Sequence, residues 1–228
     1  MGTRLAWPFL VVALVAVACS GDDDAASGPP SASAGEVVSE LARIEPSPDA
    51  PVAAVVRGID DFAFEFQRLV APESENLVFS PASIATAFAM AHAGASGHTQ
   101  ATLDAAFGFP DEPDVHEAMN ALLRALAAAE SDDVTLAVAN SGWAQTGRPI
   151  GQPYLETLAT HHGVGLHTLD LQGDSEGSRA TINDWVAEQT RDRIPELLPE
   201  GFVNPRSVYV LVNTVYLKAK WQQVFGKY

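Results

Sequence analysis

Apolar residues recur every three or four positions along the first part of the domain, a spacing that predicts an amphipathic helix over residues 52–70. Pro72 ends this pattern. The predicted buried face of this helix comprises Val52, Val55, Ile59, Phe62, Phe66 and Leu69. A different pattern follows at residues 82–92, which are apolar nearly all round and therefore predict a fully buried helix. Ser80 suits its N-cap and Pro81 its first position.

Four more segments have helical patterns, over residues 98–107, 115–129, 154–162 and 178–198. We expect Pro195 to bend or end the last of them. Short or alternating apolar runs predict strands at residues 77–79, 134–139, 166–171 and 208–217. Helices come first and strands interspersed with helices follow, an order that favours the α+β class over regular βαβ winding.

The strand predicted at 208–217 does not alternate between apolar and polar positions, so both of its faces should be covered. Asn213 interrupts this apolar run. A buried carboxamide without hydrogen-bond partners costs about 1–3 kcal/mol, so Asn213 needs partners from elsewhere in the fold.

The N-terminus has the pattern of an export signal. Arg4 precedes an apolar run of about 13 residues, shorter than the ~20 that a membrane-spanning helix needs. Small residues precede Cys19, and this pattern resembles a bacterial lipobox. It predicts a signal peptide over 1–18 and lipid on Cys19. An ordinary cleaved signal that contains a cysteine is the alternative. We expect an exported chain anchored at the extracellular face of the cell membrane.

Residues 19–51 are rich in Ala, Ser, Gly, Pro and Asp, a composition that predicts a flexible linker between the lipid and a domain over 52–228. The chain carries 13 basic and 29 acidic residues, a net charge of −16. Such a surface repels phosphate backbones, so we expect no nucleic-acid partner.

Motifs for cofactor or metal chemistry are absent from the sequence. Cys19 is the only cysteine, and the six histidines form no His-Glu-x-x-His pair. A solvated helix end is the favoured interpretation of His161-His162, with metal binding as the alternative. Neither a Gly-x-Ser-x-Gly elbow nor a Walker loop occurs, so we expect no enzyme, no cofactor and no metal.

Three stretches, in this order and spacing, resemble the serpin family: residues 76–99, residues 139–143 with Asp170, and residues 182–221 with Phe225. The resemblance extends from about residue 52 onward. It implies the serpin fold as far as strand 3 of its large sheet A, with helices A to F, strands 1–3 of that sheet and a short sheet-B strand at 77–79. Strands 1, 2 and 3 correspond to residues 166–171, 134–143 and 208–221.

The resemblance also implies roles for individual residues. Ser80, Ser83 and Asn213 match the shutter, where the family's sheet A parts, and Trp221 matches the tryptophan of the breach at the top of that sheet. From Ser80-Pro81 alone, a simple helix cap is the alternative. The family's shutter also uses a histidine from later in the chain, which is absent from this sequence, so we expect Asn213 to lack a partner.

Two positions depart from the family pattern. The usual Thr-x-Gly-Lys after helix F reads Thr190-Arg191-Asp192-Arg193, which predicts the loss of a glycine turn. Gly142 stands where an apolar residue is common.

The family resemblance implies a serine or cysteine endopeptidase inhibitor that acts by inserting a bait loop into sheet A, with the target protease as partner. The bait loop follows strand 3 in the family and lies outside this sequence. We therefore expect strand 3 to present a bare apolar edge and the chain to aggregate. A non-inhibitory serpin-fold binding protein and an inactive fragment are the alternatives.

Overall fold

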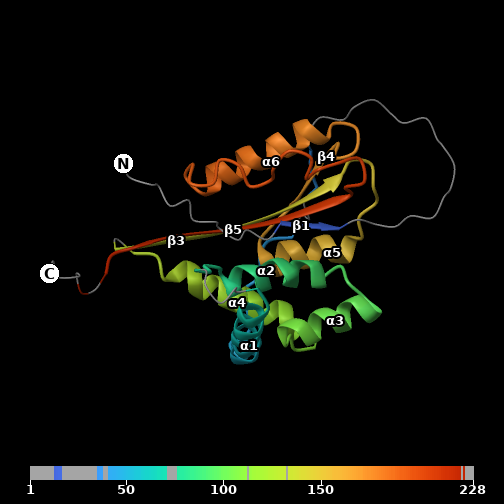
Figure 1. Ribbon diagram of the computed structural model, residues 1–228. Helices are drawn as coiled ribbons and strands as arrows, with labels where there is room; N and C mark the ends of the chain where they lie inside the picture. Colours follow the sequence, from blue (N-terminus) through green and yellow to red (C-terminus); the bar gives the residue numbers. More distant parts are fainter. Residues whose placement is uncertain are drawn as a thin grey trace, which may run out of the picture.

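The computed structural model describes residues 13–16, 35–37, 41–70, 76–111, 113–131, 133–221 and 223. A twisted sheet lies between two helical layers (Figure 1). Helix α6 (Ser175–Gln189) covers one face of the sheet. The other helices cover the opposite face, which confirms the predicted α+β architecture with both sheet faces buried.

The larger layer contains most of the predicted helices. Its members are α1 (Val52–Val70), α2 (Pro81–His92), α3 (Gly97–Phe107), α4 (Asp114–Ala128) and α5 (Gln152–Thr157), which continues into the π-helical turn η1 (Leu158–His162). As predicted, α2 is buried nearly all round. Leu69 is 77% exposed, contrary to the prediction, because α1 extends beyond the core it packs on.

Helix α1 and the end of α3 approach each other closely. A Cβ atom on Gly58 would lie 2.1 Å from the carbonyl oxygen of Phe107. Phe62 packs on Phe107 beside this contact, with ring centroids 4.6 Å apart. Gly108 then ends α3 in the left-handed conformation, with φ of 60°. Two glycines thus permit a helix crossing that no larger residue at position 58 would allow.

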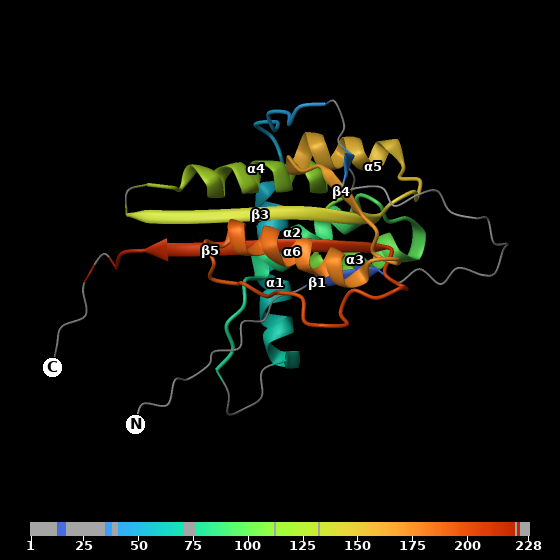
Figure 2. The ribbon, with the colours of Figure 1, turned by 90° about the horizontal axis from the view of Figure 1, so that it is seen from above.

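The central sheet has the strand order β1-β5-β3-β4-β2. Strand β3 (Val134–Gln145) runs antiparallel to β5 (Tyr209–Ala219), with which it pairs from Val134 to Ala144. Strand β4 (Leu166–Leu169) runs parallel to the end of β3. Figure 2 shows β3 and β5 side by side beneath α6. This arrangement confirms strands 1, 2 and 3 in the spatial order that the resemblance implies.

Strand β4 is much shorter than β3, and it pairs with only one segment of β3, Gly142–Gln145. Within the described part of the chain, no strand therefore flanks residues 134–141 of β3 on that side. Gly142 is required where β4 begins, because a Cβ there would lie 2.5 Å from both Leu166 Cδ1 and the Tyr209 hydroxyl. Those two side chains fill the space that a side chain at position 142 would need.

The far edge of β5 is partly covered. Strand β1 (Ala13–Ala16) pairs antiparallel with Tyr209–Val212. In the uncleaved chain, the edge that we expected to be bare is therefore covered at Tyr209–Val212. The rest of β5, from Asn213 to Ala219, has no strand neighbour on that side among the described residues.

Part of the predicted flexible linker is structured against the domain. Strand β2 (Gly35–Val37) pairs antiparallel with β4. The Ile44 amide donates to the Thr160 carbonyl at 3.0 Å, and Arg43 Nε donates to Asn120 Oδ1 at 2.8 Å. The composition of the linker did not predict these contacts. Two or three hydrogen-bonding residues are enough to dock a short polar segment, and so few residues do not change its overall composition. The rest of the linker and Cys19 lie outside the described residues.

Two predicted elements differ from the structure. Residues 77–79 form no strand; Phe79 instead packs on Phe66 of α1 at 5.2 Å, and no described strand pairs with the segment. The predicted helix at 178–198 begins earlier, at Ser175, and ends at Gln189, six residues before Pro195. The chain turns there with Arg191 and Asp192 at positive φ values of 52° and 58°. The segment thus takes left-handed backbone at two positions without a glycine.

The apolar core lies on both faces of β5. Alternate residues Val210 and Val212 pack with Ile182 and Val186 of α6 on one face. Leu211 packs with Met90 of α2 on the other. The non-alternating apolar run of β5 therefore reflects burial on both sides, as predicted. None of the helices in the described part of the chain is long and apolar enough to cross a membrane.

Candidate functional site at the centre of the sheet

The start of α2 brings two serines beneath the sheet. Ser80 is the N-cap: its backbone is extended, and its hydroxyl oxygen accepts a hydrogen bond from the Ser83 amide at 3.2 Å. Pro81 follows at the first helical position, where its missing N–H costs nothing. The cap fixes the first turn of α2 and thereby the direction of the Ser83 side chain.

Ser83 reaches across the layer to the middle of β5. Its hydroxyl donates a hydrogen bond to Asn213 Oδ1. The Asn213 side-chain nitrogen in turn donates to Asn140 Oδ1 on β3. Asn140 and Asn213 are register partners in the antiparallel β3–β5 pair, so the two carboxamides face each other. We call Ser83, Asn213 and Asn140 the polar link.

The polar link corrects one expectation. Asn213 is only 4% exposed, and both ends of its carboxamide are bonded without any histidine from later in the chain. Sequence reasoning missed Asn140 as a site residue. The sequence signals for Asn140 were its place in the family-like stretch 139–143 and its polar side chain. The β3–β5 register was needed to place it opposite Asn213.

The side chains of the polar link are better suited to holding moving elements together than to catalysis. Its members are a hydroxyl and two carboxamides, none of which titrates near neutral pH. Among the described residues, Ser83 makes no hydrogen bond to a histidine or carboxylate that would activate its hydroxyl. Each bond contributes about 1 kcal/mol, which is small enough to break and re-form when elements shift.

Open space lies beside Ser83. A cavity of about 200 Å³ separates the start of α2 from the sheet. Ser80, Ser83 and Thr86 line one side, and side chains of β3 and β5 such as Val138 and Val215 line the other. Closely packed layers resist relative movement, whereas a cavity lets side chains of the two strands shift without first expelling other atoms.

The other predicted site residues are placed as follows. Ser80 caps α2 and makes no hydrogen bond to Asn213. Trp221 lies just beyond the end of β5, and its side chain is 73% exposed. Beside it, the Lys220 amide donates to the Asp133 carbonyl at 3.1 Å and joins the ends of β5 and β3. The breach role of Trp221 remains a prediction, as does the lipid on Cys19.

Sequence reasoning also missed a buried histidine cluster between α2, α4 and η1. His116 Nδ1 lies 3.2 Å from His162 Nε2, and His92 Nε2 contacts Asp104 Oδ1 at 2.7 Å. The predicted solvated end at His161-His162 is wrong for His162, which is 3% exposed because η1 packs on α4. The positions of His92 and His116 within apolar helical segments were the signal that pointed to burial.

Burial keeps the imidazoles of His116 and His162 neutral. Desolvation, reinforced by the nearby His92 and His161, lowers the pKa of His116 to about 3. Desolvation also places the pKa of His162 well below its ordinary value, and the neighbouring His116, His161 and Arg43 act in the same direction. His116 and His162 therefore pack as uncharged side chains at neutral pH.

Comparison with known proteins gives a family for residues 57–228, which match "Serpin (serine protease inhibitor)". An uncharacterized serpin-like protein of Methanosarcina mazei is 31% identical over 182 residues, which cover 75% of this chain and 43% of the relative. Leukocyte elastase inhibitor A of Rattus norvegicus is 35% identical over 168 residues, which cover 73% of this chain and 44% of the relative. The chain thus spans less than half the length of these relatives.

Solved structures agree on the fold. The native state of the thermophilic serpin tengpin matches with a TM-score of 0.72 at 21% identity, covering 86% of this chain and 49% of tengpin. Emu (Dromaius novaehollandiae) ovalbumin matches with a TM-score of 0.70 at 24% identity, covering 76% of this chain and 49% of ovalbumin. With a family match over most of its length and this shared fold, the chain belongs to the serpin family.

Proposed function

We propose that this chain supplies the sheet-opening part of a serpin-type inhibitor of serine or cysteine endopeptidases. In inhibitory serpins a protease attacks an exposed bait loop, and the cleaved loop enters sheet A as a new strand. The proposal assigns the receiving sheet to β3, β4 and β5. The protease partner would be selected by the bait loop, which follows strand 3 in the family.

The polar link carries this proposal. It ties β5 to both α2 and β3 at the middle of the sheet, through Asn213. A sheet that opens must slide over α2, and such movement breaks the Ser83–Asn213 bond while the Asn213–Asn140 pair can travel with the strands. The link therefore acts as a latch that favours the closed sheet by about 1 kcal/mol per bond.

The edge of β5 gives independent support. Strand β1 pairs with it in the antiparallel direction at Tyr209–Val212, so this edge accepts an added strand through its backbone groups. Residues 13–16 fall within the predicted signal peptide. Its cleavage would vacate the edge in the exported protein and leave it available to the bait loop.

Lipid on Cys19 would hold the inhibitor at the extracellular face of the cell membrane. Metabolic labelling with a palmitate analogue tests this part separately. We expect the label on the wild type and no label after Cys19→Ser. Labelling that survives this substitution would exclude Cys19 as the anchor, without bearing on protease inhibition.

Inhibition is tested with the product of the complete reading frame, mixed with a panel of serine and cysteine endopeptidases. We expect a protease–inhibitor complex that survives denaturing electrophoresis, because the trapped enzyme stays covalently attached to the bait loop. Asn213→Ala should lower the yield of this complex, because a sheet without its latch can open before a protease attacks. Thr181→Ala, at an exposed position of α6, should leave the yield unchanged. Cleavage of the inhibitor by every protease tested without any complex would contradict inhibition and favour a serpin-fold binding protein.

A further inference from the structure

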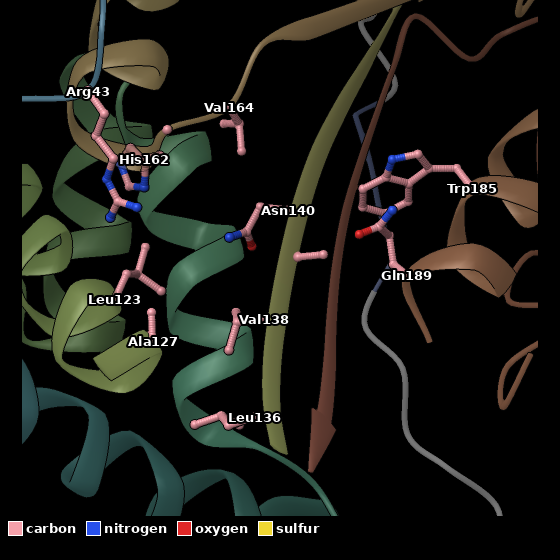
Figure 3. A pocket seen from close by; sticks show the side chains of 12 residues that line it. Arg43, Leu123, Ala127, Leu136, Val138, Asn140, His162, Val164, Trp185 and Gln189 are labelled. Carbon is pink, nitrogen blue, oxygen red and sulfur yellow. The ribbon is translucent and has the colours of Figure 1, made fainter. Parts of the chain in front are cut away.

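A second cavity opens at the unflanked edge of β3, between α4, η1 and α6 (Figure 3). Its volume is about 280 Å³. Polar residues gather at one end, where Figure 3 shows Arg43, His162 and Asn140. Apolar side chains line the rest, among them Leu123, Ala127, Leu136 and Val138. Trp185 and Gln189 of α6 border it from the other face of the sheet.

Arg43 places a cation at the polar end. Its Nε and Nη2 donate to the Oδ1 and backbone carbonyl of Asn120, at 2.8 and 3.4 Å. Among the described residues, no carboxylate forms an ion pair with Arg43. Glu45 forms its ion pair with the adjacent Arg124, at 2.8 Å. Partial burial and the nearby Arg124 lower the pKa of Arg43, and Glu45 opposes them. An unmatched, half-buried guanidinium is an attractive position for an anion, although the net charge of the chain is −16.

Backbone contacts hold Arg43 in place at the rim. The amide of the next residue, Ile44, donates to the Thr160 carbonyl at 3.0 Å. The Ile44 carbonyl accepts from Asn120 Nδ2 at 3.0 Å and from Arg124 Nη2 at 3.1 Å. The guanidinium therefore needs little reorganisation to meet a ligand, which favours binding.

Two further donors line the same end. The Nδ1 of His162 is buried and makes no hydrogen bond to a described residue, while its Nε2 contacts His116. When His116 donates in that contact, the remaining nitrogen of neutral His162 carries the proton and can donate to an anion. The Oδ1 of Asn140 accepts from Asn213, which leaves the Asn140 amide hydrogens for the cavity into which the side chain points (Figure 3).

The size and lining of the remaining cavity limit the ligand. Small-molecule sites commonly measure about 300–1,000 Å³ and combine an apolar lining with a few converging polar groups. The present cavity, at about 280 Å³, lies just below that range. Its apolar walls suit an aliphatic chain, because such a chain would be removed from water when it packs on Leu136, Val138 and Leu123.

We propose that this cavity binds a medium-chain monocarboxylate, with the carboxylate at Arg43, His162 and Asn140 and the aliphatic chain along Leu136 and Val138. Arg43 supplies charge-assisted hydrogen bonds to the carboxylate oxygens, and the two neutral donors complete the shell. This site is separate from the predicted bait loop and does not depend on protease inhibition. It touches the polar link only through Asn140.

Titration calorimetry of the full chain with octanoate tests the proposal, and octan-1-ol serves as the uncharged probe of equal chain length. We expect octanoate to bind and octan-1-ol to bind at least about tenfold more weakly, a difference of about 1.4 kcal/mol. Arg43→Gln should weaken octanoate binding by a similar factor. Arg68→Gln, at a 75%-exposed side chain of α1, is the matched control and should change nothing.

A second pair of variants leaves Arg43 and its contacts intact. Ala127 is an exposed residue of α4 that lines the apolar end of the cavity, so Ala127→Leu should fill this end and weaken octanoate binding at least about tenfold. Ala128→Leu, at the next exposed position of the same helix, should leave binding unchanged. Equal affinity for the two probes, wild-type affinity of Ala127→Leu, or no octanoate binding by the wild type would each overturn the proposal.

Discussion

Asn213 of β5 lies directly opposite Asn140 of β3, and its side-chain nitrogen donates a hydrogen bond to the Asn140 oxygen. This pair interrupts an otherwise apolar strand, and Ser83 of α2 completes it from below the sheet. A buried carboxamide bonded at both ends specifies the register of β3 against β5 and the position of both strands over α2. Three elements distant in sequence are thereby joined at one point.

The polar link should show energetic coupling. Asn213→Ala leaves both Ser83 and Asn140 without their partner and should lower the free energy of unfolding by about 2–3 kcal/mol. Ser83→Ala alone should cost about 1 kcal/mol. In the double mutant the costs should not add, because the two residues share a bond, and urea unfolding measures the difference.

The control for this cycle pairs Asn213→Ala with Thr181→Ala, an exposed position of α6 that contacts neither residue of the pair. These two changes should add within about 0.3–0.5 kcal/mol. Equal additivity in the Ser83 cycle would mean that the Ser83–Asn213 bond contributes nothing to stability.

Local sequence patterns predicted most of the fold, because burial leaves a periodic trace. The apolar face of α1 and the two buried faces of β5 are both visible in the sequence, and the family resemblance supplied Ser83 as a site residue. Asn140 required the pairing register, which depends on contacts between segments 73 positions apart. The burial of His162 required the packing of η1 on α4. Long-range contacts of this kind leave no local pattern.

The glycine contact between α1 and α3 gives a second prediction. Gly58→Ala would place a Cβ atom 2.1 Å from a backbone oxygen, which cannot move without shifting α3. We expect a loss of about 1–3 kcal/mol in the free energy of unfolding, measured in urea. Gly151→Ala is the control, because a Cβ there meets no atom within 4 Å. Equal stability of the two variants would show that the helices separate easily.

The turn after α6 gives a prediction of opposite sign. Asp192 holds a left-handed backbone, with φ of 58°, where glycine is free of strain. Asp192→Gly should therefore stabilise the protein by about 0.5–1 kcal/mol, seen as a higher thermal midpoint. Asp184→Gly, at an exposed position within α6, should instead destabilise it by about 1 kcal/mol. Destabilisation by Asp192→Gly would mean that the aspartate side chain stabilises the turn.

The buried histidines should make stability depend on pH. Burial lowers the folded-state pKa of His116 to about 3 and that of His162 well below 6.5, so between these values and 6.5 the unfolded chain binds more protons. Their contribution to stability is complete above pH 6.5 and is lost progressively as pH falls. Each histidine adds up to about 1.4 kcal/mol per pH unit to this loss.

Denaturant unfolding between pH 7 and about pH 5 isolates the effect from most carboxylates, whose ordinary pKa values are near 4. His116→Gln should reduce the slope of stability against pH by one proton. His98→Gln, at an exposed position, should leave the slope unchanged. An unaltered slope in His116→Gln would show that His116 is not held neutral by the fold.

We propose that the sheet around Asn213 is built to take up another strand. This proposal is tested by comparing the thermal midpoint of the complete reading-frame product before and after a protease cuts the predicted bait loop. Insertion of the cut loop beside β5 releases stored strain, so we expect the midpoint to rise by more than about 10 °C, which corresponds to several kcal/mol for a domain of this size. An unchanged or lower midpoint after clean cleavage would contradict strand uptake.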